Sequence, residues 1–253
     1  MTGLPIREVD PPTSLVEGDR PALRRAAASN WPIVRAALTG GDNWLDLVAG
    51  GADDASVEIL RADPAIEGRF HYAGGGSGVN FVRGRASLQT FVLALREEER
   101  IGGGHALAVQ GLLADEIWPG FSESHAMSLA PEEARPRLWI GNRTIVATHR
   151  DPTHNIAVVA AGCRRFTLFP PDQADNLYLG PAAPSPAGIP VSMVHATAPD
   201  LDRYPHFAKA MERATSAELG PGDAIFIPAG WFHHVEALAP FNMLVNYWWE
   251  PDA

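Results

Sequence analysis

The sequence predicts a mainly β protein with flanking helices, built around two packed sheets as in a jelly roll. From about Arg137 onward, short runs of apolar and β-branched residues alternate with turn residues. One long insertion at 170–219 interrupts them, whereas helices at regular intervals would indicate a parallel α/β sheet. With 253 residues, 46% of them hydrophobic, the chain is long enough to bury a full core.

Residues 1–135 are predicted to form a mixed α/β region that packs on this β core. Pro32 is suited to the first turn of a helix over about 32–38. Ser87 can cap a second helix over about 88–98, where apolar residues recur at helical spacing. Because no internal repeat or linker is present, we expect one domain over the whole chain.

Residues 136–250 are predicted to form the β core. Within the insertion we expect a short helix near 172–177, a proline-rich loop at 180–190 and a helix from about 205 to 214. The expected strands, separated by turn dipeptides such as Gly141-Asn142, are 138–141, 144–151, 155–161, 164–169, 224–228 and 243–249.

Composition narrows the classes of partner and compartment. The formal net charge of −10 argues against nucleic acid as a partner, because binding a phosphate backbone depends on Lys and Arg. The single cysteine, Cys163, excludes an intramolecular disulfide framework and fits a reducing compartment. There is no apolar run of membrane-spanning length and no signal peptide at the N-terminus. We therefore expect a cytoplasmic protein without a membrane partner.

Three residues suggest a metal site. His149 and Asp151 stand two apart in a predicted strand (THRDPTHN), so their side chains share one face. An isolated His-x-Asp is more often an ordinary polar pair, but His233 follows a later strand in a similar context (GWFHHV). Two histidines and one carboxylate form the facial set that holds ferrous iron with open positions. The adjacent His154 and His234 are weaker candidates, since each is expected on the opposite strand face or in a turn.

Arg164 is a second unusual feature. Strand alternation in RRFTLF places it on the same face as Phe166 and Leu168, opposite Arg165. If that face is the interior, Arg164 is a buried cation that needs an anion, and its planar guanidinium suits a carboxylate. A dicarboxylate cosubstrate would supply one. The alternative is an outward face with Arg164 at the surface.

Two asparagines and a tryptophan are candidates for a cosubstrate pocket. Asn155 lies four residues beyond Asp151, and Asn246 interrupts the apolar and aromatic strand LVNYWW. A buried amide there needs hydrogen-bond partners, which neighbouring backbone could also supply. Trp248 is in phase with Asn246 and is suited to wall the same pocket or to fill the core.

In this pattern the chain resembles the cupin-like JmjC family of iron(II)- and 2-oxoglutarate-dependent oxygenases, and within it the asparaginyl hydroxylases. The matching motifs, in order, are THRDPTHN, GCRRFTLFPPDQ, GPGDAIFIPAGWFHHVEAL and LVNYWW, over about 138–249. The resemblance implies a double-stranded β-helix with His149, Asp151 and His233 as iron ligands. It also implies that Arg164 binds the distal carboxylate of 2-oxoglutarate, with Asn155, Asn246 and Trp248 near the cosubstrate and O2 as co-reactant.

The sequence departs from this pattern at some positions. The asparaginyl hydroxylases have Lys where Arg164 stands. Ala108 stands where a tyrosine contacts the cosubstrate, and Val146 where a threonine is expected. Thr148 or Thr144 is the candidate to supply the missing hydroxyl.

The leading hypothesis is an iron(II)/2-oxoglutarate dioxygenase that hydroxylates a protein side chain, a peptide or a small molecule. A cupin metalloenzyme that does not use 2-oxoglutarate, such as a small-molecule dioxygenase or isomerase, is the alternative that Ala108 and Val146 favour. An inactive, metal-stabilised binding module is a third. Loops 180–190 and 121–136 are expected near the pocket entrance. The chain stops where relatives continue into dimerising helices, so the expectation of a homodimer stays open.

Overall fold

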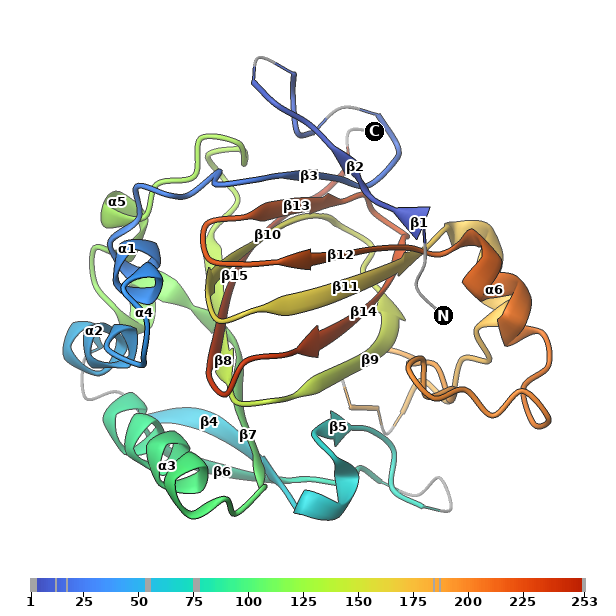
Figure 1. The fold of residues 1–253 in the computed structure, drawn as a ribbon, viewed down its shortest axis with the longest axis horizontal. Coiled ribbons are helices and arrows are strands. Elements are labelled where there is room, and N and C mark those ends of the chain that lie inside the picture. Colours follow the sequence, from blue (N-terminus) through green and yellow to red (C-terminus); the bar gives the residue numbers. More distant parts are fainter. Residues whose placement is uncertain are drawn as a thin grey trace.

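The strands pack as two facing sheets in the computed structural model, which describes residues 4–11, 13–16, 18–52, 56–74, 78–183, 185–186 and 188–251. The six-stranded sheet has the order β1 (Leu4–Pro5), β12 (Thr215–Leu219), β11 (Arg164–Phe169), β14 (Phe232–Ala237), β9 (Ile145–Arg150), β5 (Arg69–Phe70). The nine-stranded sheet has the order β2 (Arg7–Glu8), β3 (Ala22–Arg24), β13 (Ala224–Ile227), β10 (His154–Ala161), β15 (Asn242–Trp249), β8 (Pro136–Gly141), β7 (Ala106–Leu113), β4 (Ser56–Ala62), β6 (Val82–Ser87). The mainly β jelly-roll architecture predicted from the sequence is confirmed (Figure 1).

Alternation along the strands divides the core into an inner and an outer part. Val159 of β10 packs with Phe166 and Leu168 of β11 in a cluster between the two sheets. Val158, one residue earlier, turns to the other face of β10 and joins the larger cluster that includes the helices. A strand period of two therefore gives the nine-stranded sheet one face toward the six-stranded sheet and one toward the helices.

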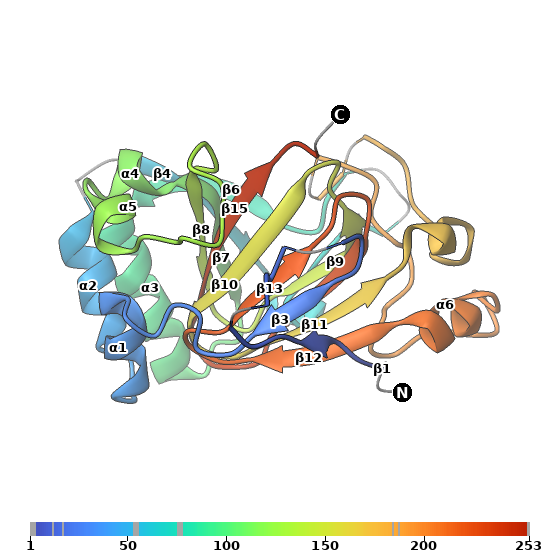
Figure 2. The ribbon, with the colours of Figure 1, turned by 90° about the horizontal axis from the view of Figure 1, so that it is seen from above.

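The helices lie at two opposite ends of the molecule. Figures 1 and 2 show α1 (Pro32–Leu38), α2 (Trp44–Gly51), α3 (Leu88–Ile101), α4 (Ala114–Ile117) and α5 (Phe121–Ser124) at one end of the molecule and α6 (Phe207–Arg213) at the opposite end. Ser87 caps α3 as predicted, with its Oγ accepting a hydrogen bond from Thr90 N. Within the described residues, none of the helices combines the length and apolar character needed to cross a lipid bilayer.

The predicted helices and strands are confirmed with small shifts at their ends. The insertion begins with a 3-10 helix, η2 (Pro171–Asn176), and ends in β12, a strand that the sequence pattern did not predict. A tight turn joins β10 to β11 at Gly162, where φ is +79°. A Cβ atom at this glycine would lie 2.4 Å from Phe241 O, so only glycine fits the turn.

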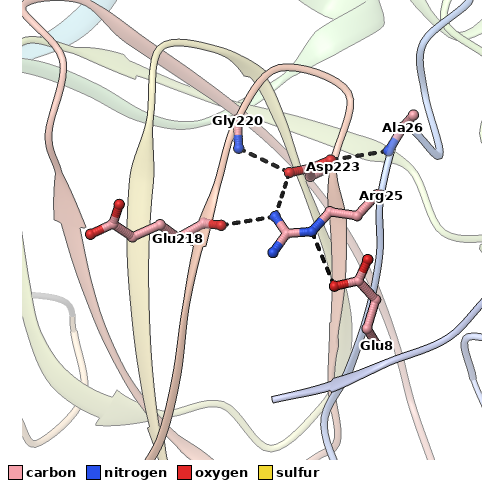
Figure 3. A network of polar contacts seen from close by, with 6 residues as sticks. All are labelled: Glu8, Arg25, Ala26, Glu218, Gly220 and Asp223. Carbon is pink, nitrogen blue, oxygen red and sulfur yellow. Dashed lines mark hydrogen bonds and ion pairs between the residues drawn. The ribbon is translucent and has the colours of Figure 1, made fainter. Parts of the chain in front are cut away.

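The N-terminal region does more than pack on the β core, because it extends both sheets. Strand β1 pairs in parallel with β12, and β3 pairs with β13. A polar network locks this junction (Figure 3): Arg25 Nη1 donates to Asp223 Oδ2 at 2.7 Å and to Glu218 O at 2.9 Å. The other Asp223 oxygen accepts from Ala26 N, and Gly220 N donates to Oδ2, each at 3.0 Å. The turn before β13 is thereby tied to the start of the chain.

Candidate metal centre

His149, Asp151 and His233 come together where β9 ends and β14 begins, in the six-stranded sheet. His149 lies near the end of β9, directly opposite His233 on β14, and Asp151 follows β9. One potential ligand atom from each residue lies within 4.8 Å of the other two. The His149 and His233 ring centroids are 4.2 Å apart, and His233 Nε2 lies 3.8 Å from Asp151 Oδ2. The three side chains thus have the spacing of a metal site.

Backbone carbonyls orient both imidazoles. His149 Nδ1 lies 2.8 Å from Ala147 O, and His233 Nδ1 lies 3.4 Å from Trp231 O. A carbonyl oxygen only accepts, so Nδ1 carries the hydrogen in each ring and Nε2 keeps its lone pair for a metal. Burial, followed by the repulsion of His149, lowers the pKa of His233 to about 4. His233 is therefore neutral near pH 7, the form that binds a metal ion.

A cavity of about 250 Å³ opens beside these three residues, between the two sheets. Most of its walls are apolar or aromatic, and polar groups converge on it from both sheets. The lining residues are Gln110, Gly111, Trp139, Val146, His149, Asp151, Asn155, Arg164, Phe166, Ile189, Ile227, His233, Val235, Leu244, Asn246 and Trp248.

Arg164 is the buried cation predicted from strand phase. Its side chain is 4% exposed and lines the cavity, while Arg165 on the other face pairs with Glu218 and Glu236. Nε of Arg164 has no hydrogen-bond partner, and none of the described carboxylates forms an ion pair with it. Burial lowers the pKa of Arg164 to about 10, so the guanidinium is still charged at neutral pH. The cavity holds a positive charge that an anionic ligand can neutralise.

The positions of Arg164 and His233 suit a short dicarboxylate between them. Leu168 of β11 stands opposite His233, and Arg164 lies four residues away on the same face. The Cα atoms of Leu168 and Arg164 are therefore roughly 13 Å apart along β11. An arginine side chain and a short dicarboxylate bound to a metal at His233 together cover this distance.

The other predicted cosubstrate residues also line the cavity. Asn155, Asn246 and Trp248 all contribute to its wall. The Oδ1 atoms of both asparagines and Nε1 of Trp248 are buried without a hydrogen-bond partner. Buried polar atoms of this kind are normally satisfied by water or a ligand, so these three side chains fit a polar occupant.

Thr148 and Ala108 do not line the cavity, although the resemblance places both positions near the cosubstrate. Thr148 does not line the cavity, because alternation along β9 turns it away from His149. Thr144 is likewise absent from the wall. Ala108 packs in a separate cluster with Leu60 and other apolar residues. Val146 does line the cavity, so an apolar group stands at that position.

The histidines ranked below the three candidate ligands are in different surroundings. His234 is buried on the face of β14 opposite to His233, where its Nε2 lies 3.9 Å from Glu236 Oε1 and neither ring nitrogen has a hydrogen-bond partner. His154 Nδ1 accepts a hydrogen bond from Ala229 N, and its ring packs near Phe226. The choice of His233 over its neighbour therefore agrees with the geometry.

Gln110, Gly111 and Trp139 were missed as wall residues by the sequence reasoning. Gln110 and Gly111 belong to β7, and Trp139 to β8. Of the two loops expected at the entrance, 180–190 contributes Ile189, although residues 184 and 187 lie outside the described part. Loop 121–136 contributes no wall residue. Its first residue, Phe121, is buried in the outer part of the core.

Fold and site together define a jelly-roll protein with a two-histidine, one-carboxylate set beside an interior cavity. Residues 10–253 match the family described as "Cupin-like domain". The chain belongs to this family, as the motifs predicted.

Several curated proteins are similar to part of the chain. "Lysine-specific demethylase JMJ31" of Arabidopsis thaliana is 35% identical over 106 residues, which cover 42% of this chain and 19% of that protein. "HSPB1-associated protein 1" of Homo sapiens is 34% identical over 125 residues, which cover 45% of this chain and 23% of that protein. "tRNA wybutosine-synthesizing protein 5" of Mus musculus is 39% identical over 103 residues, which cover 41% of this chain and 30% of that protein. The matched segments thus span less than a third of these relatives.

Proposed function

We propose that the chain is an iron(II)- and 2-oxoglutarate-dependent oxygenase that hydroxylates a protein side chain or a small molecule. The observation that carries this proposal is the buried, unpaired Arg164 guanidinium in the same cavity as His149, Asp151 and His233. A metal site alone fits many cupins, whereas a cation placed to receive a carboxylate points to a dicarboxylate cosubstrate.

Each residue has a physical role in this proposal. His149, Asp151 and His233 hold iron(II), each imidazole through Nε2. When bound there, iron(II) supplies the activation of dioxygen that couples oxidation of 2-oxoglutarate to succinate and carbon dioxide with hydroxylation of the substrate. Arg164 binds the far carboxylate of 2-oxoglutarate through charge-assisted hydrogen bonds.

The rest of the wall orients ligands and limits water. Asn155, Asn246 and Trp248 offer buried polar atoms to the cosubstrate. Phe166, Val235 and other apolar residues face the cavity, which keeps water low and strengthens the charge interaction of Arg164.

A succinate assay with and without oxygen tests the reaction type. Succinate formation that needs 2-oxoglutarate, oxygen and Asp151 is expected, and Asp151→Ala is expected to reduce it to background because the metal site loses its carboxylate. Calorimetric titration of Mn(II) gives an independent readout of the same variant. Activity that persists without oxygen, or in Asp151→Ala, contradicts the proposal.

Mass spectrometry can identify the substrate. Cell extract incubated with the active protein is expected to contain a protein or metabolite heavier by one oxygen atom, absent from extract incubated with Asp151→Ala. The relatives' names mention lysine demethylation and tRNA modification, which widens the search beyond hydroxylated side chains. The net charge of −10 makes nucleic acid the least favoured substrate of this chain.

A cupin metalloenzyme that does not use 2-oxoglutarate is the second candidate. Val146 favours it, since an apolar side chain lines the cavity where relatives have a threonine hydroxyl. Titration of the Mn(II)-loaded protein with 2-oxoglutarate separates the two candidates: heat of binding supports the oxygenase, and its absence supports the second candidate.

A further inference from the structure

Strand β7 carries a bulge where it passes the cavity. Its register against β8 shifts between Val109 and Leu112, and Gly111 within the shift has a φ of +68°. A bulge re-aims the side chains beside it, and here it places Gln110 and Gly111 in the cavity wall. Gln110 is exposed, so its amide stands at the open side of the cavity.

A cation is held at the same place. Arg137 Nη1 donates a hydrogen bond to Gly111 O at 2.9 Å, and its guanidinium carbon lies 5.8 Å from the ring centroid of Trp248. Trp139 packs against the same tryptophan edge to face, with centroids 5.1 Å apart and an interplanar angle of 78°. The bulge and the two rings therefore fix the position of the Arg137 charge.

The charges around the cavity leave Arg137 uncompensated. Apart from the histidines, the wall carries formal charge at Asp151 and Arg164, which the proposed metal and cosubstrate neutralise. Among the described residues, no carboxylate forms an ion pair with Arg137. A substrate group that enters beside Trp248 therefore meets a net positive field.

We propose that Arg137 is a specificity-determining residue that excludes cationic target groups, so that the substrate presents an uncharged or anionic polar group, such as an amide or a carboxylate, to Gln110. This inference rests on the proposed function. Aromatic faces usually attract methylated ammonium groups, but the Arg137 guanidinium already lies over Trp248. A second positive charge roughly 6 Å from the first is disfavoured about tenfold at an effective dielectric constant of about 40, between the values for a protein surface and for bulk water.

Two pairs of small probes test this selectivity on the Mn(II)- and 2-oxoglutarate-loaded protein. The first pair is N-acetyl-trimethyllysine methylamide and its carbon isostere, in which a C(CH₃)₃ group replaces N⁺(CH₃)₃. The second pair is N-acetylglutamine methylamide and N-acetylglutamate methylamide. Dissociation constants are measured by quenching of tryptophan fluorescence.

The uncharged isostere is expected to bind at least about tenfold more tightly than the trimethyllysine probe. Arg137→Met is expected to bring this ratio close to one, and Arg137→Lys to retain most of it because the charge stays. Arg83→Met is the matched control, since it removes a guanidinium that lies 5.3 Å from the Phe81 ring, and Phe81 is no part of the cavity wall. It is expected to leave the ratio unchanged.

Several results would overturn the inference. These are tighter or equal binding of the trimethyllysine probe, an unchanged ratio in Arg137→Met, no binding of the isostere, or tighter binding of the glutamine probe than of the glutamate probe. Calorimetry with 2-oxoglutarate is run first on each variant. If the wild-type protein does not bind 2-oxoglutarate but still binds the uncharged isostere more tightly than the trimethyllysine probe, only the proposed function is contradicted. If it binds 2-oxoglutarate but does not distinguish the two probes, only the selectivity is contradicted.

Discussion

Replacing Arg164 by methionine separates the role of its charge in ligand binding from its role in stability. Methionine keeps an unbranched side chain in the cavity and removes the buried guanidinium. We expect the ligand-free variant to be more stable than the wild-type protein and to lose its response to 2-oxoglutarate. A residue that held the fold together would behave in the opposite way.

The size of the effect follows from the burial of the charge. Burial lowers the pKa of Arg164 from its ordinary value to about 10. At about 1.4 kcal/mol per pKa unit, this shift corresponds to an unfavourable free energy of about 3 kcal/mol. Because the folded-state pKa is the lower one, the penalty is fully present at neutral pH and is lost only as the pH rises through about 10.

Thermal unfolding measures both effects in one experiment. A gain of about 1–3 kcal/mol raises the midpoint of the ligand-free variant by roughly 2–10 °C for a chain of this size. For the metal-loaded wild-type protein, 2-oxoglutarate at about 100 times its dissociation constant adds about 2.7 kcal/mol. Without the guanidinium, binding is expected to weaken by about 2–4 kcal/mol, roughly 30- to 1,000-fold, which removes most of that shift.

Arg165→Met is the matched control on the same strand. Arg165 faces outward and pairs with Glu218 and Glu236, so its loss is expected to leave the 2-oxoglutarate shift intact. The reasoning is refuted if Arg164→Met lowers the midpoint of the ligand-free protein and keeps the full shift with 2-oxoglutarate.

Three further substitutions test the scaffold by thermal unfolding. Asp223→Ala removes the acceptor of the Arg25, Ala26 and Gly220 hydrogen bonds and is expected to destabilise by about 1–3 kcal/mol. Glu116→Ala, at an exposed 3.4 Å pair with Arg135, is its control and should change stability by less than about 0.5 kcal/mol. Ser87→Ala removes the N-cap of α3 and should cost about 1 kcal/mol; an unchanged midpoint would contradict the capping role. Gly111→Ala should cost about 1–2 kcal/mol because its φ is +68°, and a neutral result would mean that the bulge relaxes.

The sequence by itself determined the features that follow from local periodicity. His149 and Asp151 converge because a strand presents every second residue to one face, and the same rule placed Arg164 on one face with Phe166. The structure shows that this face is the interior one. The N-cap at Ser87 is likewise a local hydrogen bond that its own segment dictates. These predictions needed no knowledge of which strands are neighbours.

Tertiary structure alone decided which distant segments meet. His233 faces His149 because of the register between β14 and β9. A shift of one residue would have placed His234 opposite His149 instead. The β7 bulge brings Gln110 to the cavity and depends on pairing with β8, while Ala108 turns into a separate apolar cluster. Parallel pairing of β1 with β12 joins segments more than 200 residues apart in the sequence, so no local pattern predicts it. The physical reason is that strand register and neighbour choice are set by contacts between residues far apart in the chain.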